Sequence, residues 1–168
     1  HDAVRSGDVA AVKALLEQTP TLVKAKDESG QTPLHWAASG GTATMLSLLV
    51  ERGADLNALD NSGNSALHLL AGRGDTAGMT LLLDKGANAD VAGSRSTPLH
   101  AAVLGRQVGA IRLLAGRKAN LEIADERGRT PLVVAAREVR GPAVVGVLLG
   151  LGATVDAADR YGATALAL

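Results

Sequence analysis

Apolar residues recur at helical spacing in two short neighbouring segments near the middle of the chain. Those that lie three or four residues apart are Leu67, Leu70 and Ala71 in the first segment, and Met79, Leu82 and Leu83 in the second. This spacing puts each set on one face of an α-helix. Gly72-Arg73-Gly74 separates the segments, which predicts that the first helix ends there and that the second begins near Asp75. The pattern therefore predicts a pair of short amphipathic helices.

The first helix of the pair opens on a four-residue phrase that returns along the whole chain. The phrase reads TPLH from Thr32, SALH from Ser65, TPLH from Thr97, TPLV from Thr130 and TALA from Thr164, with starts 33, 32, 33 and 34 residues apart. Ser and Thr are favoured N-caps, and proline at the first helical position costs no hydrogen bond. Self-similarity at this period predicts a stack of helix pairs rather than a closed globule.

A turn and a set of small residues complete the repeating unit. Asp60-Asn61-Ser62-Gly63 has Asp first and Gly fourth, which favours a type I turn ahead of the helix. Small residues recur in the middle of the first helices, at Ala37, Ala38, Ala101, Ala102, Ala135 and Ala136. They predict that neighbouring helices approach closely.

From Gly53 to His68 the chain follows the pattern G-A-D-x-N-A-x-D-x-x-G-x-T-P-L-H almost letter for letter, and this pattern resembles the ankyrin repeat. The resemblance covers essentially the whole chain. It implies an all-α solenoid of stacked helix-turn-helix units with projecting loops or β-hairpins. It also implies that the loop tips and first helices line a concave surface used to hold partner proteins.

The repeats divide the chain into one domain, residues 1–168. The expected layout is a partial N-terminal repeat at 1–26, full repeats at 27–59, 60–91, 92–124 and 125–158, and a truncated repeat at 159–168. In the partial repeat we expect a first helix ending over 3–6 and a second over 9–17. The stretch 165–168 is apolar and would be uncovered, so we expect more chain to follow in the native protein.

Two repeats depart from the pattern. The turn at 92–96 is one residue shorter than its counterparts and lacks the Asp, which predicts a tighter or irregular loop. The fourth repeat has a longer break between its helices, at 138–142, and Val133 in place of the motif His. Loops carry specificity on rigid scaffolds, so these irregularities mark places where a particular partner could be recognised.

Composition and charge exclude several classes of partner. The 17 basic and 17 acidic residues cancel without long runs of either sign, so we expect no nucleic-acid partner. The longest uncharged apolar stretch, 141–155, is shorter than the roughly 18 residues that span a bilayer, so we expect no membrane insertion. The absence of Cys fits a reducing or an oxidising compartment equally.

The recurring His and Asp residues invite a catalytic or metal-binding interpretation, which their spacing opposes. Stacked helices lie roughly 8–10 Å apart, whereas an imidazole ligand lies about 2 Å from zinc, so His35, His68 and His100 cannot share one ion. We expect each His to form local hydrogen bonds that tie its loop to its helix. Turn chemistry accounts for the repeated Asp residues. We therefore expect no metal, no cofactor and no enzymatic activity.

The interpretation we favour is a non-enzymatic, monomeric protein-binding module, and a rigid spacer or intramolecular regulatory segment of a longer protein is the alternative. The residues expected to contact the partner, from their positions in the repeat, are Glu28, Gln31, Trp36, Ser39, Asn61, Asn64, Arg73, Arg95, Leu104, Arg127, Arg129, Arg137 and Tyr161. Trp36 could instead pack on the N-terminal repeat, and Tyr161 could cover a missing neighbour. The arginines form either a discontinuous basic strip or part of a solvated mixed-charge surface.

Overall fold

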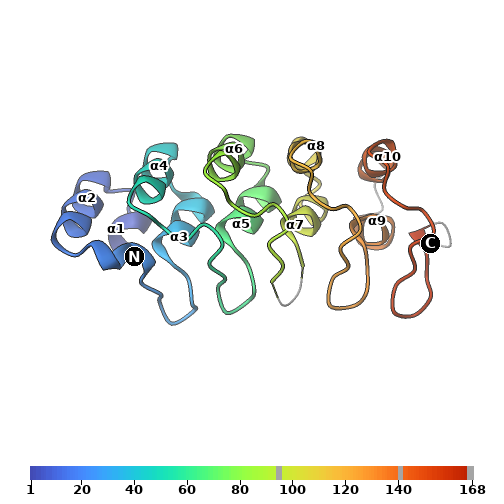
Figure 1. The fold of residues 1–168 in the computed structure, drawn as a ribbon, viewed down its shortest axis with the longest axis horizontal. Helices are drawn as coiled ribbons and strands as arrows, with labels where there is room; N and C mark the ends of the chain where they lie inside the picture. The colour runs from blue at the N-terminus through green and yellow to red at the C-terminus, as the bar shows by residue number, and fades with distance from the viewer. Residues whose placement is uncertain (94–95, 140–141, 166–168) are drawn as a thin grey trace.

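The computed structural model describes residues 1–93, 96–139 and 142–165. Helix pairs follow one another in a row, with the odd-numbered helices along one side, the even-numbered helices along the other and loops projecting from the odd-numbered side (Figure 1). The pairs are α1 (Asp2–Arg5) with α2 (Val9–Gln18), α3 (Pro33–Gly40) with α4 (Ala43–Glu51), α5 (Ala66–Arg73) with α6 (Thr76–Asp84), α7 (Pro98–Leu104) with α8 (Val108–Gly116), and α9 (Pro131–Val134) with α10 (Pro142–Gly150).

The predicted all-α solenoid is confirmed. The described residues contain no β-strand, and a single isolated antiparallel bridge joins Ala158 to Thr164. Each helix contacts its counterpart in the next pair, α3 with α5, α5 with α7 and α7 with α9 in one row, and α4 with α6, α6 with α8 and α8 with α10 in the other. The stack is therefore held together by contacts between neighbouring pairs, as expected for a repeat array.

The repeated phrase explains where the odd-numbered helices begin. In α3, α5 and α7 the side chain of the N-cap Thr or Ser accepts from the backbone N–H three residues on, and the His there accepts in return from the N-cap N–H. This reciprocal capping box satisfies two backbone donors that a helix start would otherwise leave unpaired. The Leu of the phrase enters the core, since Leu34, Leu67, Leu99 and Leu132 are at most 1% exposed.

Small residues set the spacing between the central pairs. Ala38, Ala71, Ala102 and Ala135 are completely buried in the middle of the array. A Cβ on Gly105 would lie 2.1 Å from the carbonyl oxygen of Gly72, and one on Gly93 would lie 1.8 Å from that of Gly63. Neighbouring backbones thus meet with no room for a side chain between them.

Two local elements were not predicted. A 3₁₀ turn, η1 (Pro20–Lys24), follows α2, and a π-helical turn, η2 (Ala135–Val139), follows α9. The N-cap residues of the phrase precede α4, α6 and α8 by 11 positions but precede α10 by 12. The π turn takes up this one extra residue, which is how an insertion is commonly accommodated in a helix.

Some expectations fall on residues that the structure does not describe. These are the contact assigned to Arg95 with the middle of its shortened turn, residues 140 and 141 of the lengthened break, and the apolar end 166–168.

Candidate functional site

Four of the projecting loops share one internal geometry. Asp27, Asp60, Asp125 and Asp159 each begin a loop, and one carboxylate oxygen of each accepts from the backbone N–H groups two and four residues on, at 2.8–2.9 Å. These bonds hold each loop in a fixed shape. The second carboxylate oxygen of three of them binds a side chain, Trp36, Arg129 or Arg137.

The three motif histidines link each loop to the helix of the preceding pair. Nδ1 of each ring bonds to its own N-cap residue, as the predicted local hydrogen bond requires. Nε2 reaches across to a carbonyl oxygen of the next loop, from His35 to Asn64 at 2.9 Å, from His68 to Ser96 at 3.0 Å and from His100 to Arg129 at 3.0 Å. The histidines therefore tie a helix to the following loop as well as binding locally.

Burial keeps two of these histidines neutral. Desolvation lowers the pKa of His68 and of His100 below the ordinary value of 6.5, although the hydrogen bonds to Ser96 and Arg129 act in the opposite direction. The last pair, α9 with α10, has Val133 at the motif position, so it lacks this link. Arg137 provides another one, because its Nη1 lies 2.6 Å from Oδ2 of Asp159 at the start of the last loop.

At the N-terminal end, Trp36 is half-buried and held from two sides. Its Nε1 donates to Oδ2 of Asp27 at 2.8 Å, and the Arg5 guanidinium lies over its ring, 4.8 Å from the centroid. Burial favours the neutral form of Asp27, but hydrogen bonds from Gln31, Trp36 and Ser29 outweigh it and lower the pKa. Trp36 thus packs on the N-terminal repeat and also borders an open hollow of about 230 Å³ with Ser39.

In the middle of the row, the predicted contact residues join neighbouring loops and helices. Asn61 donates from Nδ2 to the carbonyl oxygen of Glu28 at 3.0 Å, and Arg73 donates from Nη1 to that of Ala38 at 2.8 Å. Asn64 offers its own carbonyl to His35. Together with the half-buried Gln31, these side chains stand on the loop side of the array, but part of their polar capacity is used within the protein.

Toward the C-terminal end, the structure brings five of the predicted residues together around two adjoining hollows. One, of about 270 Å³, is bordered by Leu104, Arg127, Arg129 and Glu138, and the other, of about 320 Å³, by Arg127, Arg129, Glu138, Arg137 and Tyr161. Because three residues border both, we treat them as one groove, the C-terminal groove. Its ends are apolar: Leu104 is 51% exposed and Tyr161 is 81% exposed.

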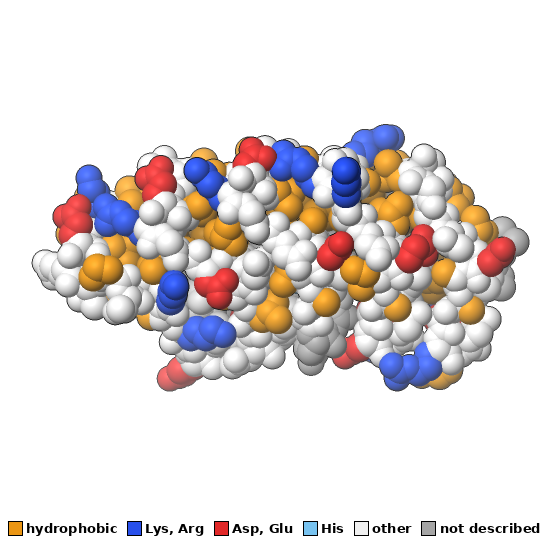
Figure 2. Space-filling view, viewed as in Figure 1, with side chains coloured by type: hydrophobic (Ala, Val, Ile, Leu, Met, Phe, Trp, Pro, Cys, Tyr) orange, Lys and Arg blue, Asp and Glu red, His pale blue; other side chains and the backbone are white. Residues whose placement is uncertain are grey.

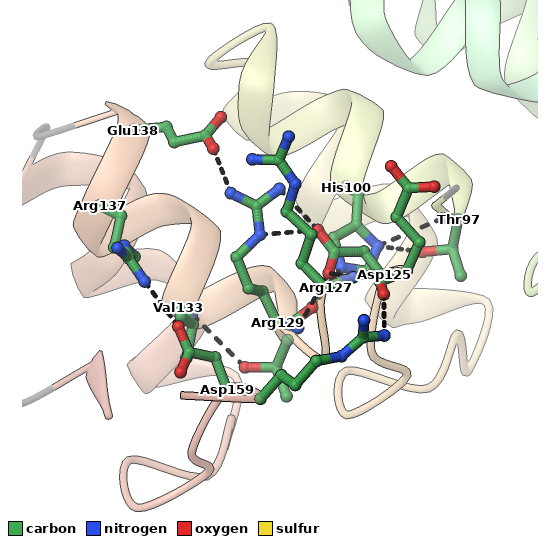
Figure 3. A network of polar contacts seen from close by, with 12 residues as sticks. Thr97, His100, Asp125, Arg127, Arg129, Val133, Arg137, Glu138 and Asp159 are labelled. Atoms are coloured by element: carbon green, nitrogen blue, oxygen red, sulfur yellow. Dashed lines mark hydrogen bonds and ion pairs between the residues drawn. The ribbon is translucent and has the colours of Figure 1, made fainter. Parts of the chain in front are cut away.

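Ion pairs organise the floor of the C-terminal groove (Figure 3). The Arg129 guanidinium donates from Nε to Oδ2 of Asp125 at 2.8 Å and from Nη1 to Glu138. Burial opposes ionisation of Asp125 and Arg129, yet their mutual hydrogen bonds prevail, so the pKa of Asp125 is lowered and that of Arg129 is raised. Arg129 is therefore a well-anchored cation whose charge is already balanced.

Arg137 and Asp159 form the second ion pair of the groove. The Asp159 side chain is fully buried while that of Arg137 remains 40% exposed. The hydrogen bond from the Ala163 N–H lowers the pKa of Asp159 most, burial acts against it, and Tyr161 and Arg137 lower the pKa further. The sequence-based selection omitted Asp159 and Glu138. Val133 could have indicated this ion pair from the sequence, because a repeat without the motif His lacks the usual hydrogen bond to the next loop.

The face of the array drawn in Figure 2 shows no concentration of one charge. On this face, acidic and basic side chains are interspersed along the array. Within the described residues, no group of three or more His, Asp or Glu side chains is arranged to hold a metal ion. No helix in the same residues has the length and apolar character needed to cross a membrane.

Comparison with protein-family models finds two overlapping matches to a model described as Ankyrin repeats (3 copies), over residues 1–92 and 80–159. A search of curated proteins found no match. The family matches span nearly the whole row of helix pairs and its capped, repeated phrases. The chain therefore belongs to the ankyrin repeat family, whose domains are in general protein–protein interaction modules and typically have no enzymatic activity.

Proposed function

We propose that this chain is a non-enzymatic module that binds a protein partner, as a monomer, through the concave face formed by its loop tips and odd-numbered helices. The binding unit is a single domain, residues 1–168, with repeats beginning near 27, 60, 92, 125 and 159. The expected contacts are the thirteen residues selected from the sequence, with Arg95 among them.

The observation that carries the proposal is the exposure of apolar side chains on this face. Leu104 and Tyr161 are both more than half exposed, and they stand at the two ends of a groove whose floor is fixed by ion pairs. Tyr and Arg, both present around this groove, are among the residue types enriched at interface hot spots. A rigid backbone adds to this, because preorganised loops lose less entropy on binding.

Comparing the proteins that the wild type and two variants capture from a lysate of the source cells tests the proposal. One variant carries Ser39→Arg, Leu104→Arg and Arg127→Glu on the proposed face. A matched control carries Ala77→Arg, Leu149→Arg and Arg112→Glu, at exposed positions of the even-numbered helices. We expect proteins captured by the wild type to be lost with the first variant and retained by the control, as measured by quantitative mass spectrometry.

Two results would contradict the proposal. Loss of the same proteins with the control variant alone would place binding on the even-numbered helices. Equal capture by all three forms would leave the proposed face without a role and would favour the spacer interpretation. Light scattering of the purified chain checks the monomeric state.

A further inference from the structure

The hydrogen-bonding capacity left over in the C-terminal groove is unequal between donors and acceptors. Asp159 uses one oxygen for the N–H groups of Tyr161 and Ala163 and the other for Arg137. Asp125 uses one oxygen for the N–H groups of Arg127 and Arg129 and the other for the Arg129 guanidinium. These two carboxylates are therefore occupied by the protein itself, and Glu138, which borders both hollows, uses one oxygen for Arg129, which balances its charge.

Donors, by contrast, remain available in the hollow between Arg127 and Tyr161. A guanidinium has five N–H donors, and Arg137 uses one in its bond to Asp159. The exposed Arg127 guanidinium makes no hydrogen bond or ion pair within the described part of the chain, and Figure 3 shows it beside the engaged Arg129 side chain. This hollow is thus rich in donors for an incoming anionic oxygen.

The backbone that carries Arg127 is fixed before any ligand arrives. Its N–H donates to Oδ1 of Asp125 at 2.9 Å, and its carbonyl accepts from the N–H of Arg160 in the last loop at 3.3 Å. Arg160 also donates from its side chain to the carbonyl of Glu126. Arg127 is therefore presented from a braced loop tip, and only its side chain has to be ordered on binding.

The other hollow has a different character. Leu104 offers half of its surface to solvent there, and His100 in its wall is kept uncharged by burial. The exposed Glu126 carboxylate stands at the same hollow and disfavours a second anion. An apolar side chain is the group that fits against Leu104.

From this arrangement we infer that the C-terminal groove binds a peptide segment of the partner that carries an Asp or Glu side chain close to an aliphatic one. The carboxylate pairs with Arg127 and takes the spare donors of Arg137, and the aliphatic side chain covers Leu104. Guanidinium groups bind carboxylates through two parallel hydrogen bonds, which supplies orientation as well as attraction. The inference rests on the proposed function and specifies the partner chemistry of one end of the same face.

Selection from a displayed library of random peptides, with the whole chain as bait, tests the inference. We expect the enriched peptides to contain an Asp or Glu near a Leu, Ile or Val. With one such peptide made synthetically, Arg127→Met should weaken binding by at least about tenfold, as for a hot-spot residue. Replacing the peptide's Asp or Glu by Asn or Gln should produce a similar loss, and the loss should shrink at high salt.

Matched variants separate the possible outcomes. Arg112→Met removes another exposed arginine, from α8, and should leave the affinity unchanged, and circular dichroism checks the fold of each variant. Enriched peptides that are basic, or that lose binding with Ser39→Arg but not with Arg127→Met, would overturn the inference and leave the proposed function standing. Peptides insensitive to Ser39→Arg, Leu104→Ser and Arg127→Met alike, or no enrichment at all, would overturn both.

Discussion

Replacing His68 by Leu removes the link between α5 and the loop that precedes α7. The ring accepts from the backbone N–H of Ser65 at 3.1 Å and bonds through Nε2 to the carbonyl of Ser96 at 3.0 Å, and it is only 2% exposed. Leu is of similar size, so the change leaves little cavity. It strands the buried N–H of Ser65 and removes one of two hydrogen bonds from the half-buried Ser96 carbonyl, which keeps the N–H of Gly93 at 3.2 Å.

The expected loss of unfolding free energy follows from these two groups. A buried polar group left unpaired costs about 1–3 kcal/mol, which applies to the Ser65 N–H, and the loss of one of the two bonds to the Ser96 carbonyl adds about 0.5–1.5 kcal/mol. We expect a total of about 2–4 kcal/mol, a large share of the ~5–15 kcal/mol that stabilises a typical domain. Val133→Leu is the control, because Val133 occupies the same motif position without these bonds. Its cost should be about 1 kcal/mol, the low end of the ~1–3 kcal/mol for an added buried methylene, because the same position holds a His in the three preceding pairs.

Urea unfolding followed at two sites is the assay. The chain has one Trp and one Tyr, Trp36 in α3 and Tyr161 in the last loop, so fluorescence and the ¹⁹F signal of 3-fluorotyrosine report on opposite ends of the array. In a stacked array a weakened junction lets the two sides unfold separately. With His68→Leu the two transitions should therefore separate. If His68→Leu lost no more unfolding free energy than Val133→Leu, the hydrogen-bond reasoning would be refuted. If the two probes still gave coincident transitions, the proposed role of His68 in joining the two parts of the array would be refuted.

Three further outcomes are expected. Burial lowers the pKa of His68 and of its counterpart in α7, so the unfolded chain binds more protons below pH 6.5; the unfolding free energy should fall as the pH drops from about 7 toward 5, and His68→Leu should make that slope shallower. Gly93→Ala should lower the unfolding free energy measured in urea by about 1–3 kcal/mol, because the new Cβ meets a backbone oxygen. Gly146→Ala, with open space around its Cβ in α10, should raise the unfolding free energy by up to about 1 kcal/mol. The Asp159 carboxylate, whose pKa is lowered, stabilises the fold above its ordinary value of 3.8 and loses that effect as the pH falls; Arg137→Met should move acid unfolding at Tyr161 to higher pH, and an unchanged midpoint would contradict the role of this ion pair.

The fold could be predicted from the sequence because its determinants are local and repeated. The N-cap phrase sets the start of every odd-numbered helix after the first, and observed starts such as Ala66 and Thr76 follow directly from the caps Ser65 and Asp75. The predicted end of the first helix, at Ser6, also lies within one residue of the end of α1 at Arg5. What the sequence could not supply was the direction of longer side chains.

The sequence therefore predicted where the candidate site residues lie, but not which groups of the same chain they bind. The repeat places Arg73 and Arg129 on the loop side, yet whether each is free depends on a carbonyl or carboxylate of another segment. Arg137 shows the same difficulty, since its bond to Asp159 spans 22 residues and depends on the π turn that carries it. Such contacts follow from three-dimensional register, which the one-dimensional pattern does not specify.

The π turn at Ala135–Val139 bears on how such arrays tolerate changes in length. In a coiled coil an insertion interrupts the heptad repeat and locally unwinds or overwinds the supercoil that both helices share. Here the addition is absorbed within one hairpin, and α10 still contacts α8 beside it. Insertions and deletions can thus accumulate in individual hairpins. One repeat of the array can change its shape while the neighbouring repeats keep theirs.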